Sequence, residues 1–185
     1  MKLRMSARRQ SGTILAIVTL ALLHLSAVRG AYAETIAAEG SIRKAPDFTL
    51  EDINPRSDSH GKRLDLAELY ADTGLILNFI ASWCKPCWPE LASFQKLSAD
   101  GLPIVCIAAD EYGGTSDVLR KAEQLGLSMP ILHVPREQIS AMEELYDHAM
   151  LPATYVIDPL GGVREVFLGA ISPEALLEEA RASLP

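Results

Sequence analysis

The chain has 185 residues, 49% of them hydrophobic, and its 17 basic against 24 acidic residues give a formal net charge of −7. This acidic balance, without a basic stripe and interleaved aromatic residues, argues against nucleic acid as a partner, because phosphate backbones are repelled by an acidic surface. The length suits one domain with a substantial core rather than two domains.

Residues 1–33 have the pattern of a secretory signal peptide. Basic residues without an acidic one precede an apolar run at 14–25, and an A-x-A pattern that suits signal peptidase follows at Ala31-Tyr32-Ala33. The basic residues at the start are Lys2, Arg4, Arg8 and Arg9. We expect cleavage after Ala33, which would place the mature protein in the periplasm.

The alternative interpretation of this leader is an uncleaved membrane anchor. Residues 11–28 are barely long enough to span a bilayer, and Thr19 and His24 weaken that interpretation. In that case the protein would touch the membrane only through its leader.

Removing 33 residues from 185 leaves 152, comprising a flexible lead-in at 34–44 and one domain at 45–185. Removing the leader's five basic residues from 17 leaves 12 against 24 acidic ones, a charge of −12.

The first half of the domain predicts two strands and a helix. Residues 45–50 alternate polar and apolar as in a strand, and turn residues follow at 54–61. An apolar patch at 64–69 ends in a helical turn. The run at 75–80 is apolar on both faces apart from Asn78, which is typical of the middle of a parallel sheet. A helix is expected at 86–98, with Pro86 and Pro89 in its first turn.

The second half predicts further β-α units and then a hairpin and a helix. In order, the expected elements are a strand at 104–109, a helix at 116–125 closed by Gly126, a strand at 131–134, a helix at 138–148, strands at 154–157 and 163–168 around a turn at 158–162, and a helix capped by Ser172. This order predicts an α/β fold of three α/β/α layers with a mixed central sheet.

Three cysteines occur, at 84, 87 and 106, and only the first two are close in sequence. A disulfide across two intervening residues would stabilise the fold by about 2 kcal/mol, less than the ~3 kcal/mol expected for a fifteen-residue loop. A strand leads to Cys84 and a helix leaves after it, and helix N-termini lower the pKa of a thiol from about 8.5. The pair is therefore better suited to chemistry than to bracing the fold.

The positions of the two cysteines predict different roles. Cys84, at the loop edge, should be an exposed nucleophile, with Lys85 adding positive charge. Cys87, one turn into the helix, should be shielded and should resolve the mixed disulfide that Cys84 forms with a partner. Pro86 restrains the loop and keeps the sulfurs within bonding range.

Simpler interpretations of the cysteines remain open. A purely structural disulfide is one, and a zinc site is another, although there is no second C-x-x-C. His60, His133 and His148 show no ligand spacing. Cys106 lies in an apolar run and is most simply an inert buried residue, a redox role being the alternative.

Taken together, these motifs resemble the TlpA/ResA-like periplasmic thioredoxins. The segment from Leu77 to the motif Trp83-Cys84-Lys85-Pro86-Cys87, followed by Glu90, carries the resemblance. Residues 45–50, 151–154 and 158–162 match the family's opening strand, second active-site loop and late hairpin. The resemblance spans Ala45 to Arg181 and implies a thioredoxin fold and a thiol:disulfide oxidoreductase.

The resemblance also implies roles for individual residues. Cys84 would be the nucleophile and Cys87 the resolving thiol, and Pro152 would be a cis proline facing them. The Leu151 backbone would then offer an edge to an extended partner segment. The predicted substrate-binding residues are Trp83, Lys85, Pro86, Leu151 and Pro152.

Glu90 has two interpretations. It lies three residues after Cys87, on the same helix face, where its carboxylate could exchange the Cys87 proton. Asn78 stands where thioredoxin has a buried aspartate, so Glu90 would supply the missing proton acceptor. The alternative is that Glu90 only complements the helix dipole. The family commonly has a proline where this chain has Ala92, whereas Pro89 precedes the acid here.

From this resemblance we expect a reductive enzyme that takes electrons from a membrane thiol donor and reduces disulfides in exported proteins, such as apocytochrome c or a copper-site assembly factor. No cofactor is expected beyond the Cys84–Cys87 disulfide. An oxidising role is the alternative direction. A thiol peroxidase would need an activating Thr or Ser where Ala81 and Trp83 stand, and a copper-binding module would need three residues between its cysteines.

Overall fold

The computed structural model describes residues 43–110, 112–147 and 150–185. The predicted signal peptide at 1–33 and almost all of the lead-in at 34–44 lie outside these residues, as does His148. None of the helices in the described part combines the length and apolar character needed to cross a bilayer.

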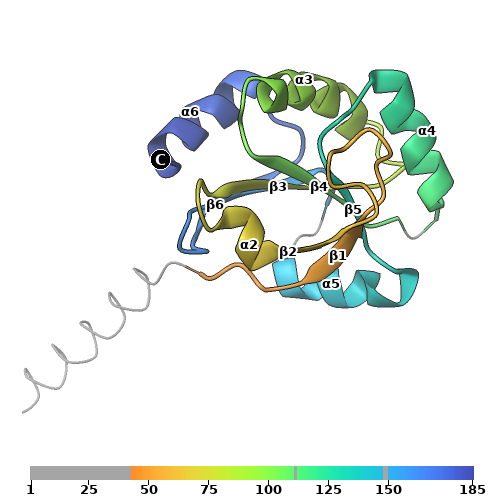
Figure 1. Ribbon diagram of the computed structural model, residues 1–185, viewed down its shortest axis with the longest axis horizontal. Helices are drawn as coiled ribbons and strands as arrows, with labels where there is room; N and C mark the ends of the chain where they lie inside the picture. Colours follow the sequence, from red (N-terminus) through yellow and green to blue (C-terminus); the bar gives the residue numbers. More distant parts are fainter. Residues whose placement is uncertain (1–42, 111, 148–149) are drawn as a thin grey trace, which may run out of the picture. The chain divides into compact units, whose positions relative to one another are not determined.

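Seven strands of the described residues form one mixed sheet, in the order β2-β1-β5-β4-β3-β6-β7 (Figure 1). The strands are β1 (Thr49–Asp52), β2 (Arg63–Asp65), β3 (Leu75–Ile80), β4 (Ile104–Ala108), β5 (Ile131–His133), β6 (Ala153–Ile157) and β7 (Val163–Leu168). Strands β3, β4 and β5 are parallel, while β6 and β1 pair antiparallel at their two sides. The predicted mixed sheet is confirmed.

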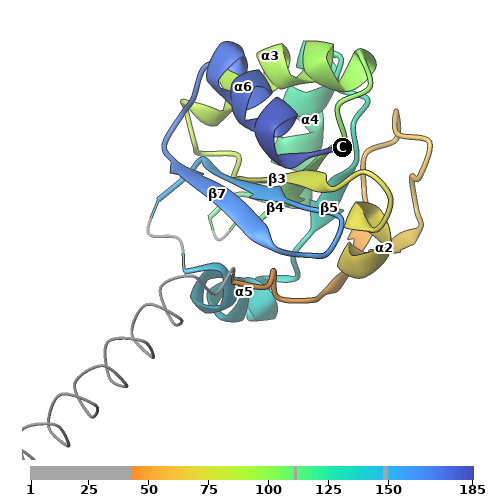
Figure 2. The same cartoon turned by 90° about the vertical axis from the view of Figure 1, so that its left-hand side faces the viewer.

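Helices cover both faces of this sheet (Figures 1 and 2). Helices α3, α4 and α6 lie on one face, and α2 and α5 lie on the other. Their bounds are α2 (Leu66–Tyr70), α3 (Cys87–Ala99), α4 (Thr115–Leu125), α5 (Ile139–Tyr146) and α6 (Pro173–Ser183), with a short 3₁₀ helix at Arg136–Gln138 before α5. The predicted three-layer α/β/α architecture is therefore confirmed.

Strand β3 is buried along its whole length. Ile76 and Ile80 belong to the core under α3, whereas Leu77 and Phe79 belong to the core on the opposite face. This alternation explains why the sequence of β3 shows a continuous apolar run, because both of its faces are covered. Asn78 shares the face of Ile76 and Ile80, so its polar side chain points toward the helix that carries Cys87.

The structure corrects two predicted boundaries. The opening strand begins at Thr49, not at residue 45, because Pro46 has no amide hydrogen and Ala45 donates its own to Gly161 instead. The helix predicted at 138–148 is α5, which ends at Tyr146 because Asp147 adopts the left-handed conformation, with a φ of 52°. The predicted closure of α4 by Gly126 is confirmed.

A buried carboxylate on strand β1 connects the turn that follows this strand to the neighbouring strand β5. Asp52 is fully buried and accepts hydrogen bonds from the backbone amides of Asn54 and Ile131, both at 3.0 Å. The Ser59 hydroxyl donates to its other oxygen at 2.6 Å. Asp52 therefore holds the 54–61 turn against β5.

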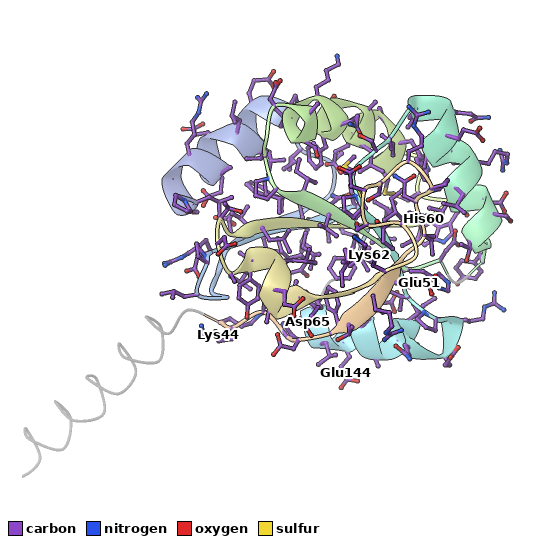
Figure 3. All side chains as sticks on the ribbon, in the orientation of Figure 1. Lys44, Glu51, His60, Lys62, Asp65 and Glu144 are labelled. Atoms are coloured by element: carbon purple, nitrogen blue, oxygen red, sulfur yellow. A yellow bond between two sulfur atoms is a disulfide. The ribbon has the colours of Figure 1, made fainter. Side chains whose placement is uncertain are left out.

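Replacing Asp52 by alanine should lower the free energy of unfolding by about 1–3 kcal/mol, because two buried amides lose their acceptor. Chemical denaturation of the oxidised protein measures this change. Glu51→Ala is the matched control, since Glu51 is exposed on the same strand (Figure 3). Equal effects of the two substitutions would contradict the role of Asp52.

Candidate active site

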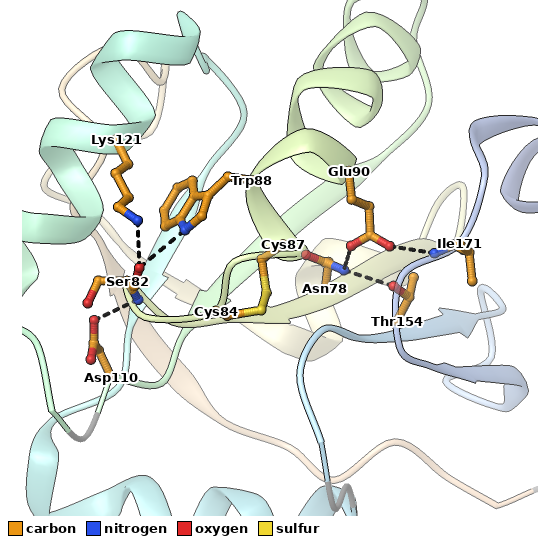
Figure 4. Close-up of a disulfide and its surroundings, with 10 residues drawn as sticks. All are labelled: Asn78, Ser82, Cys84, Cys87, Trp88, Glu90, Asp110, Lys121, Thr154 and Ile171. Atoms are coloured by element: carbon orange, nitrogen blue, oxygen red, sulfur yellow. Dashed lines mark hydrogen bonds between the residues drawn. A yellow bond between two sulfur atoms is a disulfide. The ribbon is translucent and has the colours of Figure 1, made fainter.

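The motif Trp83-Cys84-Lys85-Pro86-Cys87 connects the end of β3 to the start of α3. Cys84 and Cys87 form a disulfide, with their Cα atoms 5.5 Å apart (Figure 4). Helix α3 begins at Cys87, so the amides of its first turn face back toward Cys84. The Cys84 amide donates to Ala81 and the Cys87 amide donates to Cys84, which folds the segment into a tight turn.

The two cysteines are less accessible than the sequence suggests. Cys84 has only 2% of its surface exposed, so the expectation of an exposed Cys84 is wrong for the disulfide form. The physical reason is the bond itself, which holds the Cys84 sulfur against Cys87 inside the apolar core that includes Trp88. Trp83 is 48% exposed beside it.

The residues predicted to bind substrate lie in two segments. Trp83, Lys85 and Pro86 are exposed in the motif turn. Leu151 is half-buried and packs against the core cluster that contains both cysteines, and Pro152 is buried behind it. The Leu151–Pro152 peptide bond is cis, as the resemblance implies. The structure therefore places the second loop against the core cluster that contains the disulfide.

Glu90 lies one helical turn after Cys87 and is 6% exposed. The backbone amide of Ile171 donates to its Oε1 at 2.9 Å, and the Asn78 side-chain amide donates to its Oε2 at 3.2 Å. Burial raises the pKa of Glu90 to about 7, and the two hydrogen bonds only partly oppose that rise. Glu90 can therefore accept or release a proton near neutral pH.

Asn78 links Glu90 to the sheet. Its side-chain amide also donates to the Thr154 hydroxyl at 2.8 Å, while its Oδ1 is buried without a hydrogen-bond partner among the described residues. Thr154 and Cys106 are the register partners of Asn78 on the neighbouring strands. Cys106 is fully buried, and burial raises the pKa of its thiol, as do the charges of Glu90 and Asp52. An inert Cys106 is consistent with both properties.

Two hydrogen-bond networks flank the disulfide in Figure 4. One contains Glu90, Asn78, Thr154 and Ile171, and the other contains Ser82, Trp88, Asp110 and Lys121. Sequence reasoning missed the second network and the Ile171 amide. Asp110 follows strand β4, whose carboxyl end lies next to that of β3, and this position could have predicted that Asp110 lies near the motif. Nothing in the sequence marks Lys121. The described residues contain no group of three or more metal-binding side chains.

Comparison with known proteins decides the family. Residues 42–166 match the AhpC/TSA family. The chain belongs to this family. Within it, a thiol-disulfide oxidoreductase ResA from Oceanobacillus iheyensis is 33% identical over 137 residues, covering 71% of this chain and 67% of that protein. ResA from Geobacillus thermodenitrificans is 29% identical over 178 residues, 94% of each chain.

The structural comparison agrees with this membership. The thioredoxin domain of a thiol-disulfide oxidoreductase from Bacteroides vulgatus superimposes with a TM-score of 0.61 at 15% identity, covering 77% of this chain and 96% of that domain. This likeness shows the thioredoxin fold. The ResA-like resemblance is confirmed, and this AhpC/TSA member is a thiol:disulfide oxidoreductase whose disulfide joins Cys84 and Cys87.

Proposed function

We propose that the protein reduces disulfides in exported proteins, with Cys84 as the nucleophile and Cys87 as the resolving thiol. The observation that carries this proposal is the buried Glu90 carboxyl group, one turn after Cys87 and with a pKa of about 7. A buried thiol loses its proton reluctantly, and a neighbouring base that is half deprotonated at neutral pH assists that loss.

The first step forms a mixed disulfide. In the reduced enzyme, the Cys84 thiolate attacks one sulfur of a partner disulfide, a new sulfur–sulfur bond forms, and the partner's other sulfur leaves as a thiolate. Cys84 suits this step better than Cys87 because it precedes α3 and lies between the exposed residues Trp83 and Lys85. The helix N-terminus stabilises its negative charge.

The second step releases the partner. The Cys87 thiol gives its proton to Glu90 and its sulfur attacks Cys84, so the intramolecular disulfide forms and the partner leaves with a reduced thiol. Two electrons pass from the enzyme to the partner. A membrane thiol donor would then reduce the Cys84–Cys87 disulfide and start the next cycle. The reductive direction and this donor rest on the ResA-like kinship.

The partner would lie across the motif turn and the second loop. Trp83, Lys85 and Pro86 offer exposed contacts on one side, and the Leu151–Pro152 segment forms the other side. An extended partner segment can pair with the Leu151 backbone while its cysteine reaches Cys84. We propose exported proteins that must hold reduced cysteines, such as apocytochrome c or copper-site assembly proteins, as substrates.

The proposed location is the periplasm. The pattern at 1–33 is that of a secretory signal, and the leader would either be cleaved after Ala33 or remain as an anchor. Disulfide exchange with exported proteins requires such a compartment, because cytosolic thiols are kept reduced.

Insulin reduction with dithiothreitol tests the roles of the cysteines. Cys84→Ser should reduce the rate to the uncatalysed background, because no nucleophile remains. Cys87→Ser should accumulate a covalent adduct with the partner, since the mixed disulfide cannot be resolved. Cys106→Ala is the control and should retain activity, because Cys106 is buried away from solvent.

A fully active Cys84→Ser variant would contradict the assignment of the nucleophile. Peroxide consumption and copper titration of the same protein distinguish the two other candidate functions. Rapid turnover of peroxide would favour a thiol peroxidase, and tight copper binding at the cysteine pair would favour an assembly module.

Glu90→Gln should slow resolution of the mixed disulfide without unfolding the domain. The wild-type rate should rise as pH increases through about 7, because Glu90 loses its proton there and becomes a base. The variant should lack this rise and be slower by up to about 100-fold above pH 7. Stopped-flow kinetics measures the rate, with exposed Glu123→Gln as the control. Unchanged kinetics would remove Glu90 from the mechanism.

A further inference from the structure

Side chains from two distant segments hold the Ser82 peptide groups at the start of the motif turn. The Ser82 amide donates to Asp110 Oδ2 at 2.8 Å, and the Ser82 carbonyl accepts from Lys121 Nζ, also at 2.8 Å. The Trp88 indole donates to the same carbonyl at 3.3 Å. The backbone immediately before Trp83 and Cys84 is thus fixed from both sides (Figure 4).

Lys121 is held in one place by two different interactions. Besides its bond to Ser82, its ammonium group lies 5.0 Å from the centre of the Trp88 ring, within range of a cation–π interaction. Arg120, the preceding residue of α4, instead pairs with Asp117 and is largely exposed. Of these two neighbouring cations, Lys121 is the one that is hydrogen-bonded to the motif turn.

Asp110, on the opposite side of Ser82, also holds the loop at Gly113. Its Oδ1 accepts from the Gly113 amide at 2.6 Å. A Cβ atom on Gly113 would lie 2.1 Å from Ser82 Oγ and 2.6 Å from Asp110 Oδ2, so only glycine fits here. Ser82 is packed tightly against this loop, and the charges of Asp110 and Lys121 are held beside the turn by their hydrogen bonds to its backbone.

We propose that Lys121 is a positioning residue for disulfide exchange, which fixes the Ser82 carbonyl and favours the Cys84 thiolate of the reduced enzyme. This inference rests on the proposed function. The Cys84 amide donates to Ala81, so the turn that contains Ser82 also orients Cys84. Without Lys121, the negative charge of Asp110 would stand uncompensated beside the turn and would disfavour a thiolate.

Other charged groups also lie around the motif turn, and they limit how strongly the Cys84 thiolate depends on Lys121. Lys85 lies within the turn, and Glu90 lies on α3 beyond the disulfide. His133 and Arg136 line a cleft of about 220 Å³ that also contains Asp110. Lys121 donates a hydrogen bond to the Ser82 carbonyl, so its removal changes the contacts of the turn itself.

The test is the pH dependence of Cys84 alkylation by iodoacetamide in the fully reduced protein, followed at Cys84 by mass spectrometry. Lys121→Met keeps most of the side-chain length and removes the charge. The midpoint of the alkylation curve of this variant should lie about 0.5 pH unit above that of the wild type. This shift corresponds to a roughly threefold loss of Cys84 thiolate at pH values below the midpoint. Arg120→Met removes the same charge from the same helix and should leave the midpoint unchanged. Lys121→Arg should restore most of the wild-type behaviour.

Equal midpoints for Lys121→Met and Arg120→Met would overturn the proposal, as would a loss of stability in Lys121→Met without a shift of midpoint. If Lys121→Met does not fold, the same measurement is made on Lys121→Arg and Lys121→Gln. Equal alkylation midpoints for these two variants would overturn the proposal. Alkylation needs no partner protein. The insulin-reduction assay of Cys84→Ser therefore tests the proposed function separately from the role of Lys121.

Discussion

The buried carboxyl group of Glu90 couples the sheet, helix α3 and the disulfide. It lies on the helix that starts at Cys87, and it is hydrogen-bonded by Asn78 from the central strand and by the Ile171 amide before α6. A carboxyl group removed from water favours its neutral form, and here that preference brings its pKa to about 7. The fold thus places a carboxyl group with a pKa of about 7 one helical turn after a cysteine that no solvent reaches.

The arrangement depends on the position of β3. Because both faces of this strand are covered, its alternate side chains reach two separate cores, and a polar residue on the α3 side has no water to contact. Asn78 is that residue, and its side-chain nitrogen donates to Glu90 and Thr154, whereas its Oδ1 has no hydrogen-bond partner among the described residues. The motif follows directly after β3, so the same strand carries the Asn78 contact to Glu90 and leads to the disulfide.

Sequence reasoning recovered the features that depend on local patterns. The apolar runs of β3 and β4, the glycine that closes α4 and the spacing of Cys84 and Cys87 are each visible within a few residues, and the family resemblance added the cis Pro152. Features that depend on distant contacts were missed. Lys121 reaches Ser82 across 39 positions, and the burial of Cys84 follows from the disulfide rather than from its neighbours in sequence.

A carbon-13 NMR titration of the Glu90 side-chain carboxyl group in the oxidised protein tests the central claim most directly. In that form Cys84 and Cys87 are bonded and do not titrate, so the signal reports the environment of the carboxyl group itself. The burial described here predicts a midpoint near pH 7. A midpoint near the ordinary value of about 4.5 would mean that water reaches Glu90 and would contradict its role as the proton acceptor for Cys87.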